Sequence, residues 1–165
     1  GRTFQRLELV PSVSVEEKIQ VAAEIRGEWS QSSIGTSSVI RSVQQVMKLT
    51  GLDSIGSKSV AEIPTGKARL VELARTIVQG PSMLLLDEPA SGQNENETEE
   101  FAQILKILNT EGITILLVEH DMSLVMDVCD KVFVLDFGTL IADGTTQEIQ
   151  NNPVVIDAYL GGANG

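Results

Sequence analysis

Cysteine, basic side chains and long apolar runs are scarce in this sequence, and each scarcity excludes a class of protein. The single cysteine, Cys129, excludes an internal disulfide and fits a reducing compartment. No apolar run approaches the roughly 20 residues that cross a bilayer, and no apolar segment follows the first charges as in a secretory signal. The 12 Lys and Arg residues are outnumbered by 23 Asp and Glu, and the resulting net charge of −11 argues against a nucleic-acid or anionic-lipid surface as the main partner.

The remaining composition is that of a soluble globular protein. Hydrophobic residues make up 42% and charged residues 21% of the 165 positions, which is enough for one domain with a core of its own. The negative charge does not exclude a local phosphate site, because such a site needs backbone N–H groups and a few cations only.

The pattern of the chain changes near Gly80. Before it, apolar residues recur at helical spacing in three stretches, which begin at the Ser14–Glu17 capping-box pair, near Val39, and near Lys67. After it, short apolar runs alternate with amphipathic stretches. The expected strands are 83–86, 115–118, 132–135 and 140–142, the last two as a hairpin, and the expected helices are 101–108, 124–128, 147–150 and 154–159. This order predicts an α/β layered domain in which the first two strands are parallel and buried on both faces.

The sharpest motif is the apolar run that ends in Asp87-Glu88-Pro89. In open α/β sheets, ligands bind at the carboxyl ends of the strands. An acid at such a position holds Mg²⁺ in phosphoryl transfer, and a neighbouring carboxylate can orient or deprotonate the attacking water. The alternative is a pair of solvated acids; the preceding strand and the following proline favour the functional interpretation.

His120 is the only histidine, and it follows the second expected strand as Asp87 follows the first. Parallel neighbouring strands would bring both ends into one crevice, where an imidazole could donate a hydrogen bond to a terminal phosphate. The alternative is a structural histidine.

The segment Pro64-Thr65-Gly66-Lys67 opens the third expected helix. Thr65 is expected to cap the helix, Gly66 allows a close backbone approach, and the lysine beside a helix N-terminus attracts anions. An ordinary helix start is the alternative. The glycine-rich loop G-x-x-x-x-G-K-[ST] that cradles phosphates is absent from these 165 residues. The sequence thus contains a carboxylate to bind the metal, a carboxylate to activate water and a histidine to contact the terminal phosphate, but no phosphate-binding loop. This combination predicts a truncated nucleotide-hydrolysing domain.

Together these residues resemble the ATP-binding subunit of an ABC transporter, over the part of that domain that follows the phosphate loop. Residues 84–89 look like the Walker B motif, with Glu88 as catalytic glutamate and Asp87 as metal ligand, and His120 matches the switch histidine. Arg2-Thr3-Phe4-Gln5 resembles the segment before the helical subdomain. The resemblance therefore implies that Gln5 reaches the metal and water.

The resemblance implies a P-loop NTPase (RecA-like) α/β catalytic sheet, here incomplete, with an inserted helical subdomain. Residues 1–9 would form the Q-loop segment, 10–79 the helical subdomain and 80–165 the catalytic part. ATP and Mg²⁺ are the implied cofactors.

Asn94 lies in the segment that resembles the D-loop, where the wider family has aspartate. Ile63 to Lys67 stand in place of the usual Leu-Ser-Gly-Gly-Gln, so that Thr65, Gly66 and Lys67 would contact the nucleotide of a second subunit.

Three stretches indicate the subgroup that imports branched-chain amino acids: residues 1–5, 119–126 and 152–161. The implied partners are a second ATP-binding subunit, identical or different, and transmembrane permease subunits, with no nucleic acid. The implied location is the cytoplasmic face of the membrane, as a peripheral protein. This chain alone is expected to be inactive. A non-transport ABC-type ATPase and a non-enzymatic docking module remain as alternatives.

Overall fold

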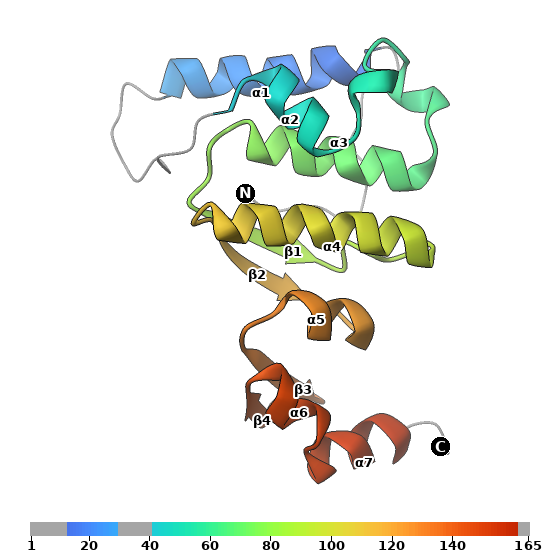
Figure 1. Ribbon diagram of the computed structural model, residues 1–165, viewed down its shortest axis with the longest axis vertical. Coiled ribbons are helices and arrows are strands. Elements are labelled where there is room, and N and C mark those ends of the chain that lie inside the picture. Colours follow the sequence, from blue (N-terminus) through green and yellow to red (C-terminus); the bar gives the residue numbers. More distant parts are fainter. Residues whose placement is uncertain (1–12, 30–40, 162–165) are drawn as a thin grey trace. The chain divides into compact units, whose positions relative to one another are not determined.

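The computed structural model describes residues 13–29 and 41–161, which fall into two compact units that divide between Glu119 and His120. The first unit contains α1 (Val15–Trp29), α2 (Val43–Leu49), the 3-10 helices η1 (Asp53–Ile55) and η2 (Val60–Glu62), α3 (Thr65–Ile77), β1 (Met83–Asp87), α4 (Glu95–Thr110) and β2 (Thr114–Val118) (Figure 1). The second contains α5 (Met122–Val128), β3 (Val132–Asp136), β4 (Thr139–Gly144), α6 (Thr146–Gln150) and α7 (Pro153–Gly161). Within the described ranges, no helix is both long and apolar enough to span a bilayer.

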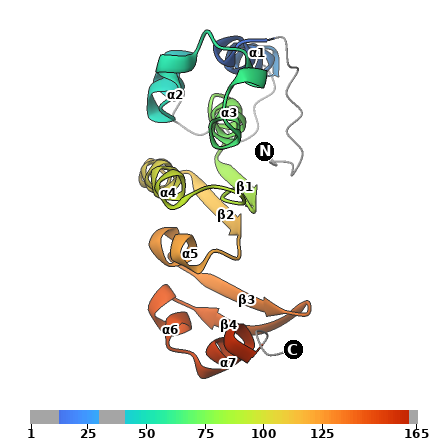
Figure 2. The ribbon, with the colours of Figure 1, turned by 90° about the vertical axis from the view of Figure 1, so that its right-hand side faces the viewer.

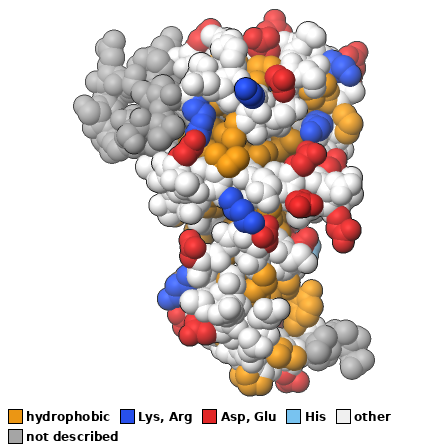
Figure 3. Space-filling model, viewed as in Figure 1, with side chains coloured by type: hydrophobic (Ala, Val, Ile, Leu, Met, Phe, Trp, Pro, Cys, Tyr) orange, Lys and Arg blue, Asp and Glu red, His pale blue; other side chains and the backbone are white. Residues whose placement is uncertain are grey.

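Helix starts follow the local sequence closely. The Ser14 backbone N–H and hydroxyl both donate to the Glu17 carboxylate, and the Glu17 N–H donates to the Ser14 hydroxyl, so the predicted capping box is confirmed. The same reciprocal arrangement opens α4, where Asn94 pairs with Glu97. The acidic side chains that follow gather at the amino-terminal end of α4 (Figure 3), where they complement the positive end of the helix dipole.

The helices α1, α2 and α3 enclose a core of their own. Helix α1 packs against both α2 and α3. The side chains they bury share an aliphatic character: Val15, Ile19, Val43, Val46, Met47, Leu70, Val71, Leu73, Ala74 and Ile77. The amphipathic spacing of the sequence predicted these helices and their apolar faces, because residues three and four apart share one face of a helix.

Strands β1 and β2 are parallel neighbours, paired in register from Met83 opposite Thr114 to Asp87 opposite Val118. Helix α4 lies along one face of this pair (Figures 1 and 2). The prediction that these strands are buried on both faces is wrong. Leu84 and Leu86 are at most 2% exposed, whereas Leu85 is 40% exposed. Within the described residues, the two strands form a two-stranded sheet, so the period-two alternation of side chains leaves one face open.

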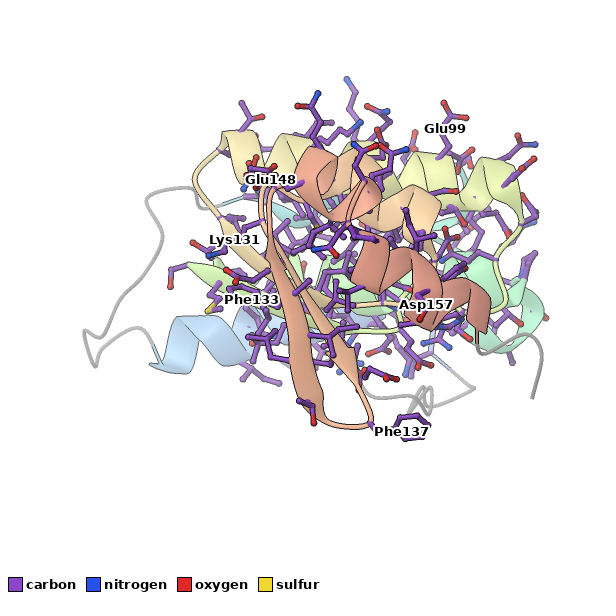
Figure 4. All side chains as sticks on the ribbon, turned by 90° about the horizontal axis from the view of Figure 1, so that it is seen from below. Glu99, Lys131, Phe133, Phe137, Glu148 and Asp157 are labelled. Atoms are coloured by element: carbon purple, nitrogen blue, oxygen red, sulfur yellow. The ribbon has the colours of Figure 1, made fainter. Side chains whose placement is uncertain are left out.

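In the second unit, β3 and β4 form the predicted antiparallel hairpin. Its turn consists of Phe137 (φ 42°) and Gly138 (φ 78°), the left-handed pair typical of a two-residue type I′ turn. Phe137 projects from the tip (Figure 4) and is fully exposed. Helices α6 and α7 both contact β4, and their positions confirm the two short helices predicted at the end of the chain.

Candidate nucleotide site at the carboxyl ends of β1 and β2

The acidic pair occupies the end of β1. Asp87 is the last residue of the strand and lies opposite Val118, the last residue of β2. The Glu88 backbone N–H donates to the Val118 carbonyl at 2.8 Å. The pairing therefore continues one residue past Asp87, and both strand ends meet at one edge of the sheet, as the parallel arrangement predicts.

Glu88 has a backbone conformation that few non-glycine residues adopt. Its φ of 45° lies in the left-handed region, which costs about 1 to 2 kcal/mol for a residue with a Cβ. Such strain persists where the surroundings enforce it, and it gathers at functional sites. The extended backbone conformation therefore ends at Asp87, although the hydrogen bonding to β2 continues at the Glu88 N–H. The two adjacent acidic residues have different backbone conformations, and both are half-buried.

The loop after Glu88 is held by hydrogen bonds of its own backbone and by the side chain of Glu119, the residue that follows β2. The Ser91 N–H donates to the Glu88 carbonyl at 3.2 Å, and the Gln93 N–H donates to the Ala90 carbonyl at 3.0 Å. The Glu119 Oε1 accepts a hydrogen bond from the Ala90 N–H at 2.9 Å. This contact ties the end of β2 to the loop that carries the acidic pair.

Glu119 belongs to one of the stretches that indicated the subgroup, but no role at this site was predicted for it from the sequence. A signal was present, because Glu119 follows an apolar strand in the same way as Asp87-Glu88 does. Its role in the structure is positional, since its carboxylate holds the backbone of Ala90, two residues from Glu88. The sequence could not show that its partner is a backbone amide 29 residues earlier.

His120 comes two residues after the end of β2 and is exposed. It is the first residue of the second unit, and the next residue, Asp121, caps α5 by accepting hydrogen bonds from the N–H groups of Ser123 and Leu124. The predicted approach of the imidazole to the same phosphate as Asp87 stays a prediction. Gln5, the predicted metal and water contact, lies outside the described residues.

The predicted nucleotide-contacting segment opens α3, but Thr65 does not cap that helix. The N-cap is Pro64, which makes no side-chain capping bond, and Thr65 is the first residue inside the helix. The reason is that Pro64 holds the extended conformation (φ −58°, ψ 153°) from which the helix starts, and its carbonyl accepts the first helical hydrogen bond, from Ala68. Thr65 therefore lies one position past the N-cap, where its hydroxyl cannot accept the capping hydrogen bond from the free N–H groups of the first turn.

Gly66 and Lys67 both face the start of α4. A Cβ placed on Gly66 would clash with the Oε1 of Glu97, so glycine leaves room for that carboxylate. The predicted contact of Gly66 with a nucleotide stays a prediction. The Nζ of Lys67 lies 3.3 Å from the Oε2 of Glu100. Asn94 is also engaged locally, because its side chain accepts from the Glu97 N–H at 3.1 Å to cap α4.

The residues of this edge fit a magnesium ion brought in with a nucleotide, and they do not fit a metal held by protein alone. Among the described residues, no cluster of three or more His, Cys, Asp or Glu side chains has the arrangement of a metal site. Mg²⁺ characteristically keeps several waters and binds through one or two carboxylates together with substrate phosphates. A single half-buried acid at a strand end, Asp87, meets that requirement.

Comparisons with known proteins agree with this geometry. The ABC transporter family model matches residues 1–91, and a model described as branched-chain amino acid ATP-binding cassette transporter matches residues 139–164. The high-affinity branched-chain amino acid transport ATP-binding protein LivG of Escherichia coli K12 is 37% identical over 98% of this chain, which spans 68% of LivG. BraF of Pseudomonas aeruginosa, with the same description, is 35% identical with the same coverage.

A solved structure shares the fold. An ATP-binding cassette of an ABC transporter in its ADP conformation superposes with a TM-score of 0.76 at 23% identity, covering 97% of this chain and 67% of its own. The P-loop NTPase fold predicted from the sequence is thereby confirmed. With the family model covering more than half of the sequence and LivG matching nearly all of it, this chain belongs to the ATP-hydrolysing, ATP-binding subunits of the ABC transporter family.

Proposed function

We propose that this protein is the ATP-binding subunit of an importer of branched-chain amino acids, in which ATP hydrolysis drives a membrane permease. The observation that supports this most is the in-register end of β1 and β2, where Asp87 and the strained Glu88 stand at the edge that α/β sheets use for ligands. The solute is inferred from LivG, BraF and the family model that matches the end of the chain. These matches favour a transporter over a non-transport ATPase or a docking module.

In this proposal the two acids divide the chemistry. Asp87 would hold a Mg²⁺ ion that arrives with ATP, and the ion would supply positive charge to the phosphoryl group that is transferred. Glu88 accepts a proton from the attacking water. Glu119 keeps the loop after Glu88 in place through the Ala90 amide. His120 and Gln5 contact the γ-phosphate and report its loss.

The remaining assignments concern the assembly. Two ATP-binding subunits, identical or different, enclose the nucleotides, and the subunit lies at the cytoplasmic face of the membrane against its permease. Gly66, Lys67 and Thr65 face the nucleotide of the opposite subunit, and Asn94 lies at the crossing between subunits.

Residues 1–9 form the Q-loop segment, the helical subdomain of residues 10–79 contacts the permease, and residues 80–165 carry the catalytic chemistry. Coupling requires that ATP bind the closed pair better than the open one.

The test is uptake by the full-length subunit assembled with its permease in lipid vesicles. We expect ATP-dependent accumulation of leucine, isoleucine or valine that exceeds accumulation of lysine, and we expect the Glu88→Gln variant to abolish it. ATP hydrolysis that proceeds without any uptake of branched-chain amino acids would contradict the proposed solute. Uptake that survives Glu88→Gln would contradict the proposed chemistry.

A further inference from the structure

The first turn of α3 lies close to the start of α4 at two residues, Gly66 and Lys67. The ammonium of Lys67 lies 3.3 Å from the Glu100 carboxylate, and the Glu97 carboxylate fills the space beside Gly66 where any other residue would place its Cβ. Lys67 is the more enclosed partner of the ion pair, with its side chain 32% exposed against 62% for Glu100. We call the Lys67–Glu100 pair the charge lock.

The α4 side of these contacts is rigid near Gly66. Glu97 Oε2 accepts from the Asn94 N–H at 3.0 Å, and the Glu97 N–H donates to the Asn94 side chain at 3.1 Å. Glu97 is therefore fixed by the capping box rather than free to swing away. Asn94 in turn follows directly on the loop after Glu88. The Glu97 carboxylate that lies beside Gly66 is thus tied to Asn94, which follows the loop that carries Glu88.

Lys67 lies in the first turn of α3. A lysine adds a full positive charge to a helix start, where the N–H groups already favour anions. A permanent positive charge there would attract any anion. The Glu100 carboxylate neutralises that charge while no nucleotide is near.

We propose that Glu100 is a positioning residue that holds Lys67 in the charge lock and releases it when the γ-phosphate of the opposite subunit's ATP arrives. The inference rests on the proposed placement of Lys67 at that nucleotide. An exposed lysine–carboxylate pair is weak, whereas a phosphate at a helix N-terminus carries more charge and gains the N–H groups as well. The γ-phosphate must therefore compete with the Glu100 carboxylate for the Lys67 ammonium. This competition lowers the apparent affinity for ATP.

The experiment compares KM for ATP and kcat in the full-length subunit assembled with its permease. Glu100→Gln removes the competing charge, and we expect KM for ATP to fall about two- to five-fold, the range of an exposed ion pair, with kcat little changed. In a Lys67→Gln background, the same Glu100→Gln change is expected to leave KM unaltered, because the cation that the carboxylate holds is gone. This non-additivity is a readout that a merely structural role would not produce.

Glu99→Gln is the matched control. Glu99 carries the same charge on the same turn of α4, is exposed, and projects outward from the helix (Figure 4), so KM is expected to stay at its original value. An equal fall of KM in Glu99→Gln and Glu100→Gln would overturn the proposal, because a general charge effect would explain both. An unchanged or higher KM in Glu100→Gln would overturn it too.

Lys67→Gln alone separates this inference from the proposed function. If Lys67→Gln raises KM while Glu100→Gln has no effect, Lys67 contacts the phosphate and the charge lock is wrong. If Lys67→Gln leaves KM unchanged, the charge of Lys67 plays no part in nucleotide binding and the charge lock is wrong, whereas a neutral contact across subunits could still be made by the glutamine. ATP-driven uptake in the original protein tests the transport function independently of either result.

Discussion

The helices and the strands of this protein bury their apolar residues in different ways. Helices α1 to α3 turn their aliphatic stripes toward one another, so that Ile19 and Val46 are fully buried. Each pair of strands instead leaves alternate side chains exposed: Leu85 and Leu116 in the first unit, and Phe133 and Leu135 in the second. These helices pack against one another, whereas the strands present open faces. The predicted catalytic acids stand at the end of such a strand.

The largest expected effect separates two neighbouring leucines of β1. Leu84 is fully buried and Leu85 is 40% exposed. We expect Leu84→Ala to lower the free energy of unfolding of the 165-residue chain by about 2 to 4 kcal/mol, because it removes buried methyl groups and leaves a cavity. Leu85→Ala should cost less than about 1 kcal/mol, since the side chain remains partly in water. Urea denaturation followed by circular dichroism measures both, and equal losses would contradict the open face.

A second prediction concerns the start of α1. Ser14→Ala removes the hydroxyl of the capping box and should cost about 1 kcal/mol in the free energy of unfolding. The effect should also depend on pH, because hydrogen bonds from the Ser14 backbone N–H and hydroxyl lower the pKa of Glu17 from its usual 4.5. A carboxyl with a lowered folded pKa stabilises the fold above pH 4.5 and loses that contribution as the pH falls through the folded value.

The measurement for this prediction is urea denaturation of the original chain and of Ser14→Ala between pH 6 and pH 3. The difference between the two proteins should shrink as the pH falls, since protonated Glu17 no longer benefits from the Ser14 donors. Thr145→Ala is a parallel case in the second unit, where hydrogen bonds from Thr145 lower the pKa of Glu148. A difference that stays constant with pH would contradict the capping geometry.

The smallest expected effect is at the tip of the β3–β4 hairpin, where a substitution should raise the free energy of unfolding instead of lowering it. Phe137 is fully exposed and has a φ of 42°, so it loses no burial when replaced. Phe137→Asn should stabilise the chain by about 0.5 kcal/mol, because asparagine adopts the left-handed conformation more readily and Asn-Gly favours a type I′ turn. The control is Phe133→Asn, on the strand itself, where the ring lies under the Lys131 ammonium at 4.8 Å. Thermal melting should show a loss there, and a loss at Phe137 as well would contradict the turn assignment.

Much of the fold could be predicted from local patterns. The Ser14–Glu17 spacing predicted where α1 begins, and the apolar runs predicted β1 to β4, because capping and period-two burial act over a few residues. Burial of β1 on both faces could not be decided in this way, since a continuous apolar run has the same sequence whether one face or two are covered. Exposure of Leu85 depends on which elements pack over the strand.

The candidate site was predicted in part. The identity of Asp87 and Glu88 as strand-end acids followed from the run before them, but the left-handed backbone of Glu88 has no sequence signal of its own. Thr65 was expected to cap α3 because of its residue type, and the conformation of Pro64 moved the helix start by one position. Contacts between distant residues, such as Glu119 with Ala90 and Lys67 with Glu100, arise only from packing.

The central claim is that Asp87 and Glu88 divide metal binding and water activation at the end of β1. The most direct measurement is a single-turnover assay of the full-length, permease-bound subunit with Mg²⁺ and ATP, alongside equilibrium binding of Mg²⁺-ATP. For Glu88→Gln we predict unchanged binding and hydrolysis slowed by at least about 100-fold, the contribution of a general base. Hydrolysis at the original rate in Glu88→Gln, with binding intact, would contradict the account.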